Sequence, residues 1–139
     1  MLAVNYRNLL TLMYPEITKI FNLETAAYFN SATVANVSIS TFYYPKSIDF
    51  TSSNYLVGIA TDALDDIPSE VIRGFKVTSP TRTLQDLFKY EEFVDPQVTF
   101  DYVPWFAVTQ NLDPRDYVEK QYHKEIEGYL RQGWSHGHW

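Results

Sequence analysis

Arg82 and Asp86 are the charged pair whose spacing most directly predicts an interaction. They are four residues apart in a segment expected to be helical, so both side chains lie on one face and can form an ion pair. In a structural interpretation, Arg82 holds a neighbouring loop or carbonyl group and Asp86 orients the guanidinium. In a functional interpretation, the two residues belong with Thr78 to a surface that binds a partner. Both interpretations remain open at the level of the sequence.

A second group of charged residues is relevant to metal-dependent cleavage. A restriction-type nuclease needs an aspartate followed by Glu-x-Lys on a strand, so that two carboxylates hold Mg²⁺ and a lysine lies beside the attacking water. The nearest strand candidate is Gly74-Phe75-Lys76, in which glycine stands where the second carboxylate should be. An acidic, solvated turn is therefore the favoured interpretation. A divergent nuclease remains the alternative, and it would use Asp62, Asp65 or Asp66 with Glu70 and Lys76.

Other catalytic patterns are missing from the sequence. No glycine precedes Gly58, so neither a phosphate-binding loop nor the Gly-Ser loop of a nucleotidyltransferase is present. Ser79 precedes a proline, which indicates a helix cap rather than a nucleophile. The three histidines, His123, His136 and His138, lie near the end of the chain, where a mobile terminus is favoured over a metal site. We expect no catalytic residue, no metal ligand and no cofactor.

Composition narrows the classes of function. The chain has 139 residues, no cysteine and a net charge of −6. Fourteen of its seventeen acidic residues and eight of its eleven basic residues lie after residue 60, so the second part of the chain carries the excess of negative charge. An acidic chain without a cluster of Lys or Arg is repelled by phosphate backbones, so nucleic-acid binding by this chain alone is disfavoured. The absence of cysteine favours a reducing cytoplasm. The longest uncharged stretches are short and polar, so we expect no membrane span.

Hydrophobic spacing and turn residues predict a single α+β domain over residues 1–132 and a flexible tail over residues 133–139. We expect a small mixed or antiparallel sheet of about three to four strands in the first half, packed by helices mainly from the second half. Predicted strands cover residues 16–21, 37–43, 55–60 and 71–77. Predicted helices cover residues 3–13, 23–29, 80–90 and 97–109, a segment that starts at Asp113-Pro114, and residues 120–131.

Capping residues support two of these helices. Asn22 is a good N-cap for the short helix over residues 23–29, and Ser79-Pro80 opens the next helix with a hydroxyl cap and a proline at its first position. Leu84, Leu87 and Phe88 then define the buried face of that helix. Aromatic residues of the second half are expected in the core or on an apolar partner surface, namely Tyr102, Trp105, Phe106, Tyr117 and Tyr122.

One segment resembles the AbiEi-type antitoxins of bacterial abortive-infection systems. In that family a strand leads into a helix that starts with T-S-P-x-R-T-L-x-D-L. Here the matching run is Gly74-Phe75-Lys76-Val77-Thr78-Ser79-Pro80-Thr81-Arg82-Thr83-Leu84-Gln85-Asp86-Leu87. A second likeness, from Tyr14-Pro15 to Tyr28, is similar to the family's strand followed by a small helix containing alanine. The resemblance spans roughly residues 14–130.

The resemblance implies an antitoxin-like binding or regulatory protein, not an enzyme, that neutralises a nucleotidyltransferase-like toxin. Members of the family usually carry an N-terminal winged helix-turn-helix that binds the promoter. Only thirteen residues precede Tyr14 here. We therefore expect the chain to correspond to the C-terminal domain alone, without the promoter-binding role. An accessory domain of a mobile element is a further alternative, and a homo-oligomer formed through the aromatic helices is also considered.

Overall fold

A computed structural model describes residues 18–35 and 39–136 of the chain, without the side chains of residues 133–136. The helix predicted over residues 3–13 lies outside the described residues. So do residues 16 and 17 and residues 37 and 38, which belong to two of the predicted strands. Within the described residues, no helix is long and apolar enough to cross a membrane.

The described chain forms a five-stranded mixed sheet followed by a group of helices. The strands are β1 (Ile20–Phe21), β2 (Ser40–Pro45), β3 (Leu56–Thr61), β4 (Ser69–Ile72) and β5 (Phe75–Thr78). Their order across the sheet is β3-β2-β1-β5-β4. The pairs β1/β5 and β2/β3 are parallel, whereas β1/β2 and β4/β5 are antiparallel. The predicted α+β class and the place of the sheet in the first half are confirmed, although the sheet has more strands than expected.

The additional strand arises at Gly74. The single strand predicted over residues 71–77 is wrong, because the chain turns back there and forms the hairpin of β4 and β5. Arg73 and Gly74 both have positive φ, at 52° and 85°. Two consecutive positive φ angles are typical of the type I′ turn, whose twist matches that of a two-residue hairpin. Glycine therefore marks a reversal of the chain rather than an interruption within one strand.

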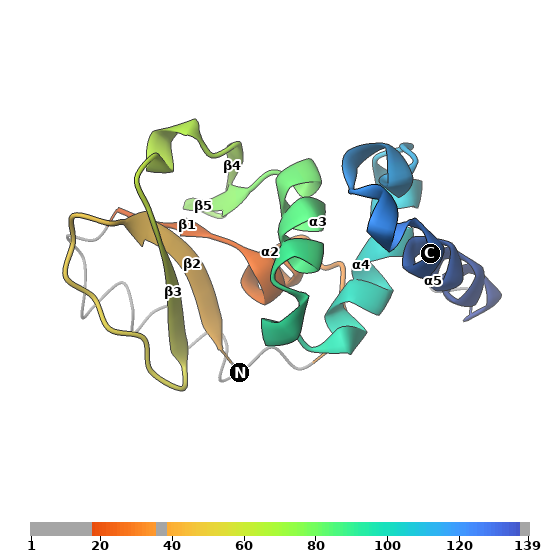
Figure 1. Ribbon diagram of the computed structural model, residues 1–139, viewed down its shortest axis with the longest axis horizontal. Coiled ribbons are helices and arrows are strands. Elements are labelled where there is room, and N and C mark those ends of the chain that lie inside the picture. The colour runs from red at the N-terminus through yellow and green to blue at the C-terminus, as the bar shows by residue number, and fades with distance from the viewer. Residues whose placement is uncertain (1–17, 36–38, 137–139) are drawn as a thin grey trace.

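Among the described residues, four helices lie beside and beyond the sheet (Figure 1). They are α2 (Leu23–Phe29), α3 (Pro80–Lys89), α4 (Pro96–Thr109) and α5 (His123–His136). Short 3₁₀ turns connect the elements, namely η1 (Leu64–Asp66), η2 (Glu91–Phe93), η3 (Pro114–Tyr117) and η4 (Lys120–Tyr122). Figure 1 shows α3 between the sheet and the α4–α5 pair. Helix α5 continues past residue 132, where the tail was predicted to begin.

The predicted side-chain cap is present at α3 but not at α2, and α4 also has a side-chain cap. The Ser79 hydroxyl accepts a hydrogen bond from the Arg82 amide at 3.3 Å, and Asp95 accepts one from the Gln97 amide at 2.9 Å. Asn22 lies at the N-cap of α2, but its side chain makes no capping hydrogen bond. The predicted side-chain cap at Asn22 is therefore wrong. The Thr41 hydroxyl replaces it, because it accepts a hydrogen bond from the Thr25 amide in the first turn at 3.4 Å while donating to the Asn22 carbonyl at 2.6 Å.

The hydrophobic core has two main parts. One lies among the helices, where α3 contributes the fully buried Leu84, Leu87 and Phe88, as the spacing predicts. The other lies on the sheet, where Phe21 packs edge to face against Phe42 with ring centroids 6.5 Å apart. Helix α2 supplies residues to both parts, so it joins the sheet to the helices.

The edge strand β3 is partly covered by the loop that precedes it. The Ser52 hydroxyl accepts a hydrogen bond from the Gly58 amide at 3.0 Å and donates to the Gly58 carbonyl at 3.4 Å. Ser53 occupies the two corresponding backbone groups of Leu56. The Ser53 amide donates to the Leu56 carbonyl, and the Ser53 hydroxyl accepts a hydrogen bond from the Leu56 amide. These four backbone groups of β3 are therefore occupied by the chain itself.

A buried carboxylate holds α4 against the segment after α2. Asp101 is 1% exposed and accepts hydrogen bonds from the Thr33 hydroxyl at 2.8 Å, the Val34 amide at 2.9 Å and the Gln97 side-chain amide at 2.8 Å. Removing the carboxylate would take the acceptor from three partly buried hydrogen bonds, which costs more than losing a single surface contact. Asp101 is thus a structural anchor of the helical half.

We predict that Asp101→Ala lowers the free energy of unfolding by about 1–3 kcal/mol, because the substitution removes the acceptor of three partly buried hydrogen bonds. Urea denaturation measures this change. The matched control is Glu92→Ala at an exposed position, for which a change within about 0.5 kcal/mol is expected. Equal stability of the two variants would contradict the anchoring role of Asp101.

Glu24 gives the fold a distinct dependence on pH. Its carboxylate is 8% exposed and accepts a hydrogen bond from the Asp95 amide at 2.9 Å. Burial raises the pKa of Glu24 above its ordinary value of 4.5, although the hydrogen bond from the Asp95 amide opposes the change. The folded state therefore binds the proton of the Glu24 carboxyl group more tightly than the unfolded chain does.

We predict that this contribution of Glu24 to stability falls as pH rises from about 4.5 through the raised pKa, and then stays constant. Glu24→Gln keeps an oxygen acceptor for Asp95 and removes the titration, so the difference in free energy of unfolding between variant and wild type grows over that pH range. Urea denaturation at a series of pH values measures it. A difference that does not change with pH would show that Glu24 titrates as it does in the unfolded chain.

Candidate functional site

Helix α3 has two faces of opposite character. Thr83, Leu84, Leu87 and Phe88 are buried, whereas Arg82, Gln85 and Lys89 reach solvent on the other side. Asp86 also belongs to the polar stripe but is only 2% exposed. This division follows from the helical repeat, because residues separated by three, four and seven positions share one face.

Asp86 is the centre of the polar stripe. Its Oδ1 accepts a hydrogen bond from Arg82 Nε at 3.1 Å, and its Oδ2 accepts one from the Tyr43 hydroxyl at 2.7 Å. Arg82 Nη2 also donates to the Tyr43 hydroxyl at 3.4 Å, and the guanidinium carbon lies 5.4 Å from the centroid of the Tyr43 ring. The predicted pair of Arg82 and Asp86 is present, and Tyr43 extends it to the sheet. Arg82 is held by this ring and by Asp86 rather than by a loop carbonyl.

Burial and the neighbouring charges shift the pKa of each member of this cluster. Burial raises the pKa of Asp86, while the hydrogen bond from Tyr43 and the charge of Arg82 oppose the rise. Burial and the Asp86 carboxylate raise the pKa of Tyr43, which keeps its hydroxyl protonated as a donor. Burial lowers the pKa of Arg82, but the hydrogen bond with Tyr43 and the charge of Asp86 outweigh it and raise the pKa overall. Arg82 therefore stays charged.

Thr78 occupies a different place from Arg82. It is fully buried at the end of β5, and its hydroxyl lies 2.6 Å from that of Thr83. Thr83 in turn donates to the Thr78 carbonyl at 3.2 Å. These bonds fasten the start of α3 to the sheet. Among Thr78, Arg82 and Asp86, the residue with substantial exposed surface is Arg82, whose side chain is 28% exposed.

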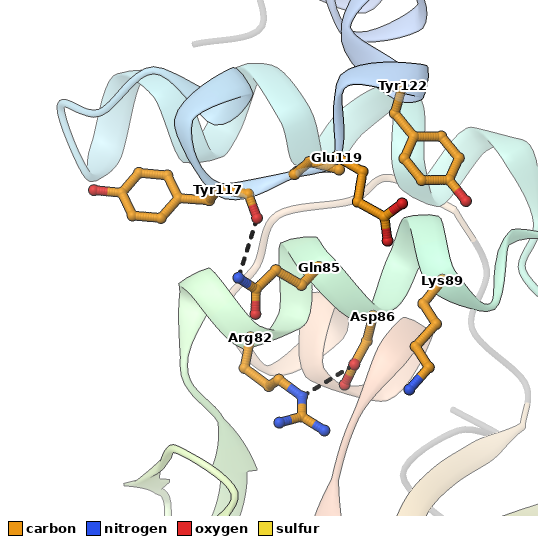
Figure 2. Close-up of a pocket in the computed structure, with 8 residues that line it drawn as sticks. Arg82, Gln85, Asp86, Lys89, Tyr117, Glu119 and Tyr122 are labelled. Carbon is orange, nitrogen blue, oxygen red and sulfur yellow. Dashed lines mark hydrogen bonds and ion pairs between the residues drawn. The ribbon is translucent and has the colours of Figure 1, made fainter.

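A cavity of about 430 Å³ lies over the polar stripe of α3. Its opposite wall is the segment of η3 and η4, which contributes Tyr117, Val118, Glu119 and Tyr122. Gln85 Nε2 donates to the Tyr117 carbonyl at 3.0 Å and ties this wall to the helix (Figure 2). The cavity is lined by side chains of both charges and by two tyrosines, so it suits a polar ligand.

The wall of η3 and η4 is held from behind by the helical core. The Tyr122 ring lies 5.1 Å from that of Phe88, and the Tyr117 ring lies 5.8 Å from that of Phe106. The His123 Nε2 lies 3.0 Å from the Val118 carbonyl oxygen, and Arg115 bridges Asp113 and Glu127. The cavity thus has two supported walls.

Among the predicted aromatic residues, Tyr102 and Phe106 are fully buried and belong to the core. Trp105, Tyr117 and Tyr122 are half-buried and pack against it. The prediction that these aromatics serve the core is confirmed for Tyr102 and Phe106. Tyr117 and Tyr122 also line the cavity, which the sequence interpretation did not anticipate.

The residues of the nuclease alternative do not form a metal-binding group. Asp62, Asp65 and Asp66 lie in or beside η1, whereas Glu70 is on β4 and Lys76 is on β5. Among the described residues, no three acids or histidines are arranged to hold a metal ion. His138 lies outside the described residues, and the side chain of His136 is not described, so the histidine arrangement stays a prediction.

Tyr43 is the site residue that sequence reasoning missed. It lies on the strand predicted over residues 37–43, but nothing in that strand's pattern indicates that its hydroxyl meets Asp86, which is 43 positions further along the chain. Glu119 and Lys89 were also missed. A polar stripe at positions 82, 85, 86 and 89 of an amphipathic helix is the signal that could have included Lys89.

Comparison with known proteins gives no matching family model and no matching curated protein.

We predict that Tyr43→Phe lowers the free energy of unfolding by about 1–3 kcal/mol, because Asp86 loses a donor in a buried setting. Chemical denaturation measures the change. Tyr90→Phe is the control, since no hydrogen bond of the Tyr90 hydroxyl is found among the described residues. If Tyr43→Phe is no less stable than Tyr90→Phe, the hydroxyl does not contribute to holding α3 on the sheet.

Proposed function

We propose that this chain is an antitoxin-like binding domain of a bacterial toxin–antitoxin or phage abortive-infection system. In this proposal it neutralises a nucleotidyltransferase-like toxin by binding rather than by catalysis. The supporting observation is the position of Arg82 within the segment that resembles AbiEi-type antitoxins. Asp86 and Tyr43 hold its guanidinium, and its outer end is open to solvent beside the cavity.

Each part of the segment that resembles AbiEi-type antitoxins has contacts that are consistent with a binding role. Thr78 and Thr83 fasten the helix start, and Leu84 and Leu87 anchor it in the core. Arg82 is then presented at a fixed position, so its contact with a partner would require little loss of side-chain freedom. A rigid arginine on a supported helix is a common kind of anchor in protein interfaces.

The charge of the chain supports a protein partner rather than nucleic acid. The net charge of −6 disfavours contact with nucleic acid by this chain alone. Val108 and Leu112 are 48% and 40% exposed at the end of α4 and just beyond it. They offer an apolar contact for a second copy of the chain, so the proposal includes a homo-oligomer formed through the end of α4.

The test is growth rescue by co-expression with the neighbouring reading frame. We predict that the intact chain restores growth and that Arg82→Lys reduces rescue, because lysine keeps a positive charge near Asp86 but loses the planar group. Arg73→Lys, in the exposed turn between β4 and β5 and outside the cavity lining, is the matched control for the same exchange, and it should rescue fully. Circular dichroism and urea denaturation first establish that each variant folds.

A toxin that remains active in the presence of the intact, folded chain would overturn the proposal. Full rescue by Arg82→Lys would retain the antitoxin function but remove Arg82 from the binding surface. A neighbouring reading frame that is harmless on its own would instead favour an accessory domain of a mobile element.

A further inference from the structure

The strand β4 forms an open edge of the sheet. It is the last strand in the sheet order, at the end opposite β3, and β5 is its neighbour on the inner side. Ser69, Glu70 and Val71 are all exposed, and Val71 is 68% exposed although its side chain is apolar. The loop before β3 occupies backbone groups at the opposite edge. The two edges of the sheet therefore offer different surfaces to another chain.

The hairpin register determines which backbone groups of β4 point outward. The Pro68 carbonyl accepts a hydrogen bond from the Ser79 amide at 2.9 Å, so Pro68 faces β5. Facing alternates along an antiparallel strand, so Ser69 and Val71, one and three positions further on, face away from β5. Among the described residues, no hydrogen bond of these outward groups is found. Their amides and carbonyls are therefore available to another strand.

We propose that two copies of the chain pair through β4, antiparallel and around a two-fold axis at Val71. In this register the Val71 amide of each copy donates to the Val71 carbonyl of the other copy, and the two exposed valine side chains come into contact. Such an interface uses the same surface on both copies and joins two sheets into one. The inference does not depend on the proposed function, and it uses a different surface from the end of α4.

Charge favours a second copy of the chain as the occupant of this edge. Arg73 lies in the turn just after β4, and Asp65 and Asp66 lie in η1 just before it. Antiparallel pairing brings the Arg73 end of each strand toward the η1 end of the other strand, and the two-fold axis makes this happen twice. Among the described residues, the ion pairs include none of these three side chains. A cation of each copy can therefore approach acids of the other copy.

The same register avoids repulsion and limits the assembly to two copies. An axis at Glu70 would place two carboxylates directly opposite each other, which is destabilising. With the axis at Val71, Glu70 lies opposite the other copy's Ile72 instead. Pairing uses β4 of both copies and leaves the two β3 edges at the ends of the joined sheet, where Gly58 and Leu56 are already bonded to serines. Strand pairing therefore adds no third copy.

Disulfide cross-linking tests the register directly, because the chain has no cysteine of its own. The α-carbons of a hydrogen-bonded antiparallel pair lie about 5.5 Å apart, within the range that a disulfide spans. We expect Val71→Cys to form linked dimers at least about tenfold faster than Val34→Cys, because pairing raises the effective concentration of the two thiols. Val34 lies in the loop after α2 and is 79% exposed, so its cysteine variant measures the rate of random collisions.

Sedimentation equilibrium of the unsubstituted chain measures the association itself. The contact is smaller than a standard interface, so we expect reversible dimers with a dissociation constant of roughly 0.1–1 mM. Val71→Lys should weaken dimerisation about fivefold, because it removes the valine contact and places like charges at the axis. Val34→Lys is the matched control and should leave dimerisation unchanged. Circular dichroism first establishes that each variant folds.

Three outcomes would overturn the inference. Equal rates of cross-linking for the two cysteine variants would show that the Val71 positions meet only by collision. A chain that stays monomeric over this whole range of concentration would show that β4 does not pair. Dimerisation that Val71→Lys does not weaken would place the contact between copies on another surface, such as the end of α4.

Discussion

The buried carboxylate of Asp86 is the constraint on which the arrangement of the site depends. It is 2% exposed and lies where α3 meets the sheet, so its charge has to be compensated by neighbouring groups. The Tyr43 hydroxyl from β2 and the Arg82 guanidinium from the same helix provide that compensation. One carboxylate therefore fixes the rotation of α3 about its axis and the direction in which Arg82 points.

The remaining elements support this arrangement from two sides. Below, the bonds of Thr78 with Thr83 hold the first turn of α3 on β5. Above, the bond from Gln85 to the Tyr117 carbonyl and the packing of Tyr122 on Phe88 hold the segment of η3 and η4 over the helix. The cavity is the space left between a sheet-anchored helix and a core-anchored turn, so its shape depends on both halves of the fold.

Local signals predicted much of this structure, and contacts distant in sequence account for the rest. Ser79-Pro80 predicted the start of α3, and leucine spacing predicted its buried face, because both depend on neighbours within one or two turns. The reversal at Gly74 was missed, since a glycine within a β-rich run is compatible with a continuous strand or with a hairpin. Tyr43 and Glu119 were missed because their positions beside α3 follow from sheet order and from the path of the chain after α4. The spacing of Arg82 and Asp86 predicted their pairing, but not the burial that makes it matter.

The serines before β3 affect how the molecule can associate with others. An uncovered edge strand exposes backbone amides and carbonyls that can recruit a strand from another chain. On β3, Ser52 and Ser53 already occupy those groups of Gly58 and Leu56. Sheet extension by an added strand is thereby discouraged at this end, through hydrogen bonds with two serines rather than through the charges or prolines that many proteins use. β4 forms the opposite edge of the sheet, so this protection applies to the β3 edge.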